Sequence, residues 1–468
     1  MILYNKIFIS FYGDDFTGST DVMESLALNG IRTALFLAPP TAQEIENFVL
    51  KKSIDGTGKK NIEAFGVAGI SRSLSITQME QELRPVFTAI SKIPSDFFHY
   101  KVCSTFDSSP EVGSIGYATD LALEYFPSDI IPTLIGAPFL NRFCIFGNLF
   151  AKIDGITYRL DRHPTMSKHP VTPMHESDLR IHLGKQTTRP VELFDLFMLD
   201  EHDTIQNSTF NKLNRKKGEI LLFDTYNIHH LLSIGRLIIE NKQQGPQLIV
   251  GSSGVEYALT YHLHKSGRLL KPASPQSPGL ADQIVALSGS CAPTTGKQIQ
   301  WALKKGFADI RLNTTDLIDL QKQNAEMERV KKAALDALSK KQSVMIYSAI
   351  GPDDPAIEKT REYLENFGQE DTNVRQRLAA NQGKILKSIL ETCGKKRTVV
   401  CGGDTSGYVA RELGIYALET LIPIAPGAPL CTAHSQNASF DGLEISLKGG
   451  QNGKEKYIES VLYGKNLD

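Results

Sequence analysis

The chain of 468 residues is long enough for more than one hydrophobic core, because a single core rarely grows beyond about 250–300 residues. Hydrophobic residues make up 41% and charged residues 22%, which is typical of folded globular proteins and excludes disordered and fibrous classes. The 51 basic residues nearly balance the 52 acidic ones, and a net charge of -1 argues against a general nucleic-acid-binding surface. We therefore expect at least two globular domains and no nucleic-acid partner.

The sequence also argues against a membrane partner. No stretch approaches the roughly 18 apolar residues that a spanning helix needs. Met1–Tyr12 is apolar but lacks a small-residue cleavage site, so it predicts a first buried strand and not a signal peptide. The six cysteines are scattered without a C-x-x-C pair, which is typical of reduced thiols, and we expect a cytoplasmic protein.

In the first 270 residues, short apolar runs alternate with longer amphipathic ones. The runs expected to form buried strands are Ile7–Tyr12, Thr33–Leu37, Ala64–Val67, Phe97–Val102, Glu219–Phe223 and Gln247–Val250. Helices are expected at Thr20–Leu28 and Ile76–Ile90, and Pro85 predicts a kink or break in the second. This alternation predicts an α/β domain with a mostly parallel sheet.

The stretch Cys103–Gln186 departs from this rhythm and is rich in Pro, Gly, His and Arg. We expect it to be an irregular elaboration over the sheet, and long irregular segments in compact chains are often functional. Its histidines match no metal-binding spacing. His169, in HPVTPM, is expected to be a positioned polar residue at a cleft.

A proline-rich stretch, KPASPQSPGLA at Lys271–Ala281, predicts the boundary between two domains, 1-270 and 282-468. Beyond it the α/β rhythm returns. The expected elements are strands at Ile284–Ser288, Ser343–Ser348, Thr398–Cys401 and Ile422–Pro423, and helices at Gln321–Lys341 and Tyr408–Leu413.

The first candidate site is Gly13–Gly18, reading GDDFTG directly after the first expected strand. In doubly wound sheets, ligands bind beyond the carboxyl ends of strands. Asp14 and Asp15 cannot both be buried there without a partner, and one of them could act as a general base toward a hydroxyl. Thr17, Ser19 or Thr20 would then cap the following helix. The alternative is a helix-capping turn with surface aspartates.

Two cations are expected at the same sheet edge. Arg72 follows the strand Ala64–Val67, and Lys101 ends the strand Phe97–Val102. An arginine can hold a carboxylate through two hydrogen bonds, and a lysine offers a point charge. Together they could hold an anionic substrate, although a single arginine is more often a surface residue.

The second candidate site is Gly402–Gly407, reading GGDTSG between the strand Thr398–Cys401 and a helix. Glycines there allow backbone N–H groups to approach a phosphate at the helix N-terminus. Asp404 could orient a metal ion or a nucleotide hydroxyl, and the alternative is a tight strand-to-helix turn. The P-loop motif is absent, and a missing G-x-G-x-x-G after the first strand disfavours a dehydrogenase.

These and further motifs occur in an order that resembles the four-carbon acid sugar kinase family, which includes threonate, erythronate and 3-oxo-tetronate kinases. The resemblance covers nearly the whole chain. Its motifs lie at Phe11–Asp21, Gly69–Ser73, Tyr100–Gly116, His169–Met174, Gly251–Gly254, Ser288–Gln298, Gly402–Gly407, Pro426–Pro429 and Leu447–Gly453.

The resemblance implies two α/β domains with mostly parallel sheets and an interdomain cleft: an acid-sugar-binding N-terminal domain and a nucleotide-binding C-terminal domain. It implies ATP and Mg²⁺ as cofactors and phosphoryl transfer to a hydroxyl of a small acid sugar. The residues expected at the acid sugar are Asp14, Asp15, Thr17, Arg72, Lys101 and His169, with Asp15 and Asp14 as the candidates for the base. Those expected at ATP are Ser290, Gly402, Gly403, Asp404, Thr405, Gly427 and Gly450, with Asp404 at the metal.

The chain also departs from the family pattern. Ala292 stands where the family has a serine, and the usual ending reads KGGQNG at Lys448–Gly453. Tyr158–Met166 resembles the subgroup associated with RuBisCO-like proteins, in which 3-oxo-isoapionate kinase is known, and implies a branched or oxidised acid sugar. The alternatives are an inactive ATP or metabolite sensor on the same fold and, less favoured, a nucleotide-dependent oxidoreductase. A homodimer is compatible with each of these.

Overall fold

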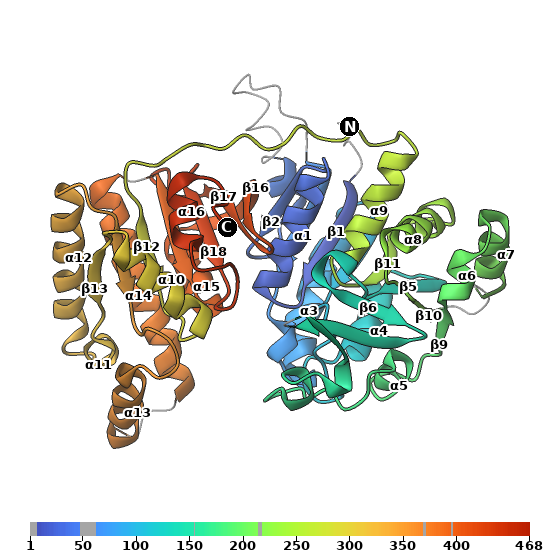
Figure 1. The fold of residues 1–468 in the computed structure, drawn as a ribbon, viewed down its shortest axis with the longest axis horizontal. Helices are drawn as coiled ribbons and strands as arrows, with labels where there is room; N and C mark the ends of the chain where they lie inside the picture. Colours follow the sequence, from blue (N-terminus) through green and yellow to red (C-terminus); the bar gives the residue numbers. More distant parts are fainter. Residues whose placement is uncertain (1–6, 47–61, 154, 214–217, 368–370, 395) are drawn as a thin grey trace. The chain divides into compact units, whose positions relative to one another are not determined.

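The computed structural model describes residues 7–468 except 47–61, 154, 214–217, 368–370 and 395. The chain divides into two compact units, Met1–Ala273 and Ser274–Asp468, which run from blue to yellow-green and from yellow to red in Figure 1. This division falls within the proline-rich segment Lys271–Ala281. In the described part of the chain, no helix is both long enough and apolar enough to cross a membrane.

The first unit contains a sheet of eight described strands, all parallel, in the order β2-β3-β1-β4-β11-β5-β10-β9. The strands are β1 (Ile7–Gly13), β2 (Thr33–Phe36), β3 (Ala64–Ala68), β4 (Ser95–Lys101), β5 (Ile130–Leu134), β9 (Val191–Phe194), β10 (Glu219–Phe223) and β11 (Gln247–Gly251). β2, β5, β10 and β11 are buried along their whole length, and β1, β3 and β4 at all but one residue each, as their continuous apolar runs predict.

Helices cover both faces of this sheet (Figure 1). The chain runs from β1 to β2 in one direction and from β3 back to β4 in the other, so right-handed crossovers place α1 (Phe16–Leu28) and α3 (Ile76–Ser91) on opposite faces. α1 packs against α9 (Gly254–Lys265), which packs against α8 (Ile228–Glu240), and α3 packs against α4 (Ile115–Tyr125). Further helices of this unit are α5 (Leu179–Leu183), α6 (Leu196–Asp200) and α7 (Asp203–Leu213).

Two expectations for these helices are wrong. The N-cap of α1 is Asp15, whose Oδ1 accepts from Gly18 N at 2.7 Å, and not a threonine or serine within the helix. The break expected at Pro85 is also wrong, because α3 continues from Ile76 to Ser91. Pro85 is exposed, so water can reach the carbonyl group that its missing N–H leaves without a helix partner.

The stretch Cys103–Gln186 is more regular than its composition predicts. It includes α4 and β5 of the main fold, and a small antiparallel sheet of β6 (Arg142–Ile145), β7 (Asn148–Ile153) and β8 (Ile156–Arg159). Left-handed backbone at Asn141 and Phe146 allows the chain to enter and leave β6 by tight turns.

The second unit contains a mixed sheet in the order β13-β14-β12-β15-β18-β17-β16. The first five strands of this order, from β13 to β18, run parallel to one another. β17 runs antiparallel to β18, and β16 runs antiparallel to β17. The strands are β12 (Val285–Ser288), β13 (Ala308–Arg311), β14 (Val344–Tyr347), β15 (Arg397–Cys401), β16 (Ile415–Ala425), β17 (Ala428–Ser435) and β18 (Glu444–Lys448). The described helices are α10 (Pro293–Lys304), α11 (Thr314–Ile318), α12 (Gln323–Ser339), α13 (Pro355–Phe367), α14 (Asp371–Cys393), α15 (Gly403–Glu412) and α16 (Tyr457–Tyr463).

Two elements of this unit are longer than expected. The expected helix Tyr408–Leu413 begins at Gly403 as α15, so the GGDTSG motif lies mostly inside its first turns. The expected strand Ile422–Pro423 is part of β16, which forms a long hairpin with β17. Pro423 and Pro426 hide the pattern from the sequence because proline is rare within strands.

Candidate active site

Four strand ends meet at one edge of the first sheet. Gly13 at the end of β1 is in register with Ala68 of β3 and with Lys101 of β4, and Lys101 is in register with Gly251 of β11. The connection after β1 leads to one side of the sheet and the connection into β4 leads to the other side. The gap between these two parallel strands is therefore a topological switch point, where ligands bind in such sheets. The loops that carry Asp14, Asp15 and Arg72 start here.

Arg72 binds both aspartates of the first loop. Its Nη2 and Nε donate to Asp14 at 2.6 and 3.1 Å, and its Nη1 and Nη2 donate to Asp15 at 2.7 and 2.9 Å. Backbone contacts fix this geometry, because Arg72 N donates to Asp14 O at 3.0 Å. Burial raises the pKa of Asp14 and Asp15 adds to the rise, although Arg72 opposes both effects.

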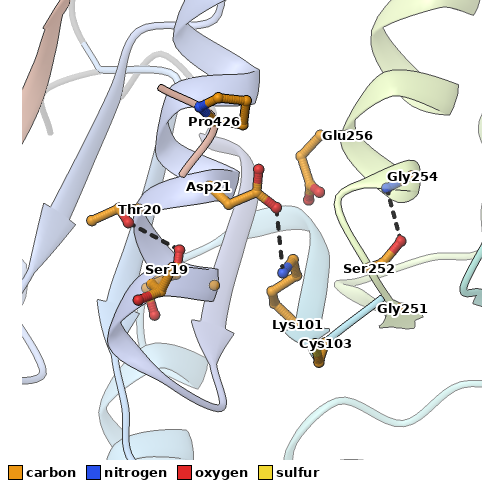
Figure 2. A network of polar contacts seen from close by, with 12 residues as sticks. Ser19, Thr20, Asp21, Lys101, Cys103, Gly251, Ser252, Gly254, Glu256 and Pro426 are labelled. Atoms are coloured by element: carbon orange, nitrogen blue, oxygen red, sulfur yellow. Dashed lines mark hydrogen bonds and ion pairs between the residues drawn. The ribbon is translucent and has the colours of Figure 1, made fainter. Parts of the chain in front are cut away.

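Lys101 is a second buried cation at this edge. Its Nζ lies 3.6 Å from Asp21 Oδ2, as Figure 2 shows, and its side chain is 4% exposed. Burial acts to lower the pKa of Lys101, but Asp21 and Asp14 outweigh it and the pKa is raised. Burial raises the pKa of Asp21, against the effect of Lys101, and Glu256 adds to the rise.

Gly18 lets these groups approach one another. A Cβ atom at this position would lie 2.6 Å from Asp15 Oδ1, 3.2 Å from Lys101 Nζ and 3.6 Å from Arg72 Nη2. The first turn of α1 therefore lies against both cations. A larger residue would displace the carboxylate of Asp15 and crowd the ammonium group of Lys101.

A buried acid–imidazole pair lies beside Lys101. Glu256 Oε1 is 2.6 Å from His99 Nδ1, and His99 Nε2 is 3.1 Å from Gly251 O, with both side chains fully buried. The carbonyl can only accept, so Nε2 carries a hydrogen, and a second proton must lie between the ring and the carboxylate. Glu256 Oε2 has no hydrogen-bond partner in the described part of the chain, and Figure 2 shows Glu256 near Asp21 and Lys101.

The structure does not bring every expected acid-sugar residue into this cluster. Thr17 lies in the first turn of α1, where its carbonyl accepts from Thr20 Oγ1 at 2.9 Å. His169 accepts from Thr172 N at 3.1 Å, and no hydrogen bond or ion pair between described residues links it to Asp14, Asp15 or the two cations.

Sequence reasoning missed Asp21, His99 and Glu256. Asp21 follows Gly18 by three residues, which places both on one face of a helix. His99 alternates with Lys101 along β4 and shares its face of the sheet. Glu256 is the acidic residue in the first turn after GSSG. These signals were readable, but none of them pairs residues 157 positions apart.

The expected nucleotide residues gather at an edge of the second sheet. Ser288 of β12 is in register with Cys401 of β15, which is in register with Lys448 of β18. The connection after β12 leads to one side of the sheet and the connection into β15 leads to the other, so this is also a topological switch point. The loops after these strands carry Ser290, Gly402 and Gly450.

Contacts between these loops are close enough to require glycines. Gly402 has a φ of +121°, and a Cβ there would lie 3.4 Å from Ser290 N and 3.2 Å from Thr405 Oγ1. A Cβ at Gly450 would lie 2.6 Å from Ser290 Oγ. Gly403 is exposed, and no described group lies within 4 Å of a Cβ built on it, so the start of α15 is open to a ligand.

Gly427 and Asp404 complete the expected set. Gly427 lies in the turn between β16 and β17 with a φ of +68°. Asn452 Nδ2 donates to Pro426 O at 3.1 Å, which holds this turn beside the loop of Gly450. Asp404 lies in the first turn of α15, and its side chain falls outside the described residues.

Comparison with known proteins assigns the chain to a family of two-domain kinases. The family model described as a sugar-binding N-terminal domain matches residues 9–259, and that described as a nucleotide-binding C-terminal domain matches residues 285–458. The chain therefore belongs to the acid sugar kinase family that these two domains define.

Individual relatives agree over nearly the full length. The chain is 41% identical over 461 residues to 3-oxo-isoapionate kinase of Paraburkholderia graminis, covering 98% of this chain and 95% of that protein. It is 26% identical over 450 residues to 3-oxo-tetronate kinase of Pseudomonas savastanoi pv. phaseolicola, covering 96% and 95%. Solved structures from Salmonella typhimurium LT2 and Haemophilus influenzae have TM-scores of 0.75 and 0.72 at 23% and 22% identity, each covering 97% of this chain and 98% of the other. They share its fold.

Proposed function

We propose that this protein is an ATP-dependent kinase that phosphorylates a hydroxyl of 3-oxo-isoapionate or a closely similar acid sugar. The observation that carries the proposal is 41% identity to a 3-oxo-isoapionate kinase over 98% of the chain. The 3-oxo-tetronate kinases, at 26% and 27% identity, support the same type of reaction on an oxidised acid sugar. We propose that the first unit binds the acid sugar and the second binds ATP.

In the proposed first site, Arg72 and Lys101 hold the substrate carboxylate. Lys101 is buried and Arg72 is partly buried, and both lie within 4 Å of a single point beside Gly18. Arg72 must then share its donors between the ligand and the two aspartates. Asp15 and Asp14 hydrogen-bond the substrate hydroxyls, and one of them accepts the proton of the attacking hydroxyl.

In the proposed second site, the backbone N–H groups at the start of α15 and the loop around Gly450 hold the phosphates. A helix N-terminus with open glycines favours an anion without a P-loop. Transfer then requires the hydroxyl and the γ-phosphoryl group to be brought into line. The cleft between the domains that the sequence predicts stays a prediction.

Magnesium fits this scheme only as a companion of ATP. No group of three His, Cys, Asp or Glu residues in the described part of the chain could hold a metal ion. Mg²⁺ is commonly bound through substrate phosphates with one or two carboxylates, and Asp404 is the proposed protein ligand. The ion would supply charge neutralisation during transfer. We also propose a cytoplasmic location, consistent with six cysteines that are all free, and a homodimer as the assembly to test.

The test is a coupled ADP-release assay on the full chain with 3-oxo-isoapionate, 3-oxo-tetronate, threonate and erythronate. We expect ADP release with one acid sugar at a rate well above that without substrate, and no change in NAD(P)H absorbance. Binding of ATP and an acid sugar without ADP release would favour the alternative of an inactive sensor. Release without any dependence on the acid sugar would contradict the kinase.

A further inference from the structure

A buried lysine lies beneath the proposed nucleotide loops, at a position that the sequence analysis left without a role. Lys448 is the last residue of β18 and is 1% exposed. Gly402 N donates to its carbonyl oxygen at 2.9 Å, so it is directly connected to the start of α15. Burying an ammonium group is unfavourable unless other groups compensate for the lost water.

The compensation at Lys448 is incomplete. Its Nζ donates to Thr295 Oγ1 at 3.0 Å and to Gly449 O at 2.9 Å, and lies 5.7 Å from the centre of the Tyr457 ring. In the described part of the chain it forms no ion pair with a carboxylate, and burial lowers its pKa. Lys101, equally buried, has Asp21 beside it. Among the described side chains, Lys448 thus lacks the anion that a buried cation normally has.

Lys448 is also connected to the loop that borders the site. Thr295 Oγ1, which accepts from Lys448, donates to Gly450 O at 2.7 Å. A Cβ on Gly450 would contact Ser290 Oγ at 2.6 Å, so the position of Gly450 sets the edge of the proposed phosphate site. The two hydrogen bonds from Lys448 to Thr295 and from Thr295 to Gly450 therefore hold the Gly450 loop in place next to a positive charge.

We propose that Lys448 is a positioning residue for the nucleotide phosphates, and that the bound polyphosphate supplies the negative charge that Lys448 lacks in the free protein. The inference rests on the proposed function, because it takes the loops around Gly402 and Gly450 as the ATP site. Its distinctive consequence is that the benefit of the lysine grows with the number of phosphate groups on the ligand. Without nucleotide, the buried charge of Lys448 lowers the free energy of unfolding.

The experiment compares wild-type and Lys448→Met full-length protein for binding of ATP, ADP, AMP and adenosine by calorimetry. We expect Lys448→Met to weaken ATP by about tenfold or more, the size of one lost charge-assisted interaction, ADP less and AMP less again, with adenosine unchanged. In thermal unfolding without ligand, the variant should be as stable as wild type or more so, whereas the ATP-induced increase in Tm should be smaller.

Thr295→Val serves as a second variant, because it cuts the link to Gly450 and keeps the lysine charge. It should weaken ATP, ADP and AMP by one common factor that is smaller than the loss of ATP affinity in Lys448→Met. Equal weakening of ATP and adenosine by Lys448→Met, with a lower Tm of the free protein, would show a purely structural lysine and overturn the proposal. Unchanged ATP affinity would also overturn it. If wild type bound none of the four ligands, the proposed function itself would fail.

Discussion

Arg72 serves two carboxylates with one guanidinium group, and this sets what its removal does. Arg72→Ala takes away the donors that hold Asp14, which is 2% exposed, and leaves a buried carboxylate without its main partner. We expect the KM for the acid sugar to rise about tenfold or more, since a charge-assisted pair is lost, while the KM for ATP stays within about twofold. Steady-state kinetics with each substrate varied in turn measures both values.

A neutral substrate provides the control for Arg72. An uncharged sugar alcohol should be a poor substrate of wild type, and Arg72→Ala should affect it far less than it affects the acid. Equal rises in both KM values would indicate misfolding, and an alcohol as good as the acid would refute the carboxylate clamp.

Asp15 has a structural role and a proposed chemical one, and Asp15→Asn separates them. Asparagine also caps helices, so the contact with Gly18 N can survive, whereas the proton acceptor is lost. If Asp15 is the base, kcat should fall by about 10²-fold or more with little change in acid-sugar binding. Rapid-mix kinetics together with calorimetry measures the two effects.

The matched control is Asp15→Ala, which should cost about 1 kcal/mol more stability because the cap is lost as well. An Asp15→Asn enzyme with normal kcat and a raised KM would make Asp15 a binding residue. Asp14 would then be the first candidate for the base. His169, whose Nδ1 accepts from Thr172 N, would be the next candidate.

At the scale of elements, α5 makes the stability of the first unit sensitive to pH. His182 lies on this helix, its Nε2 is 3.0 Å from Ser108 Oγ, and burial and the nearby Lys185 lower its pKa to about 4. The unfolded chain takes up this proton near pH 6.5, so protons favour unfolding between the two values. Stability should therefore fall by about 3 kcal/mol from this group as the pH drops from 6.5 to 4.

His182→Gln isolates that contribution from those of other histidines. The variant should be less stable than wild type at pH 7, and the difference should shrink or reverse as the pH approaches 4. Urea unfolding at several pH values measures this. A constant difference from pH 7 to 4 would contradict the assignment.

How far the sequence predicts the elements depends on how local their causes are. Continuous apolar runs such as Ile7–Tyr12 predict strands correctly, because burial on both faces leaves a direct trace in the sequence. Pro85 was misjudged because the sequence does not show that it lies on an exposed helix face. The β16–β17 hairpin was largely missed because its partners, and not local propensity, keep it extended.

The candidate sites divide in the same way. Loops that follow parallel strands must lie at one sheet edge, so the sequence could place Asp14, Arg72 and Lys101 near one another before the structure was known. It could not show that Arg72 pairs with both aspartates, or that Glu256 lies against His99. Those contacts depend on strand order, which joins β1, β4 and β11 although the chain separates them widely.

For the whole molecule, the proposed reaction depends on a divalent ion. Adding excess EDTA to the active enzyme should reduce ADP release to background, and excess Mg²⁺ should restore it, because transfer spreads negative charge over the phosphoryl oxygens. ATP binding measured in EDTA should survive in weakened form through the backbone of the second unit. Full turnover in EDTA would refute the requirement.

The three aspartates and two cations at the first sheet edge have a consequence for protons. The net charge of the whole chain is -1, and Asp14, Asp15 and Asp21 against Arg72 and Lys101 leave this single edge with an excess carboxylate. An acid sugar brings another, and the pKa values of Asp14 and Asp21 are already raised by burial.

We therefore expect acid-sugar binding to take up protons from solution, so that affinity weakens as the pH rises. The heat of binding, measured at one pH in phosphate and in Tris, should then differ between the buffers. The difference should equal the number of protons taken up multiplied by the difference between the two heats of ionisation, and equal heats would contradict this. If uptake occurs, the anionic substrate binds together with a proton that compensates for its charge. The first site would then prefer an anionic substrate, although the net charge at the site would not change on binding.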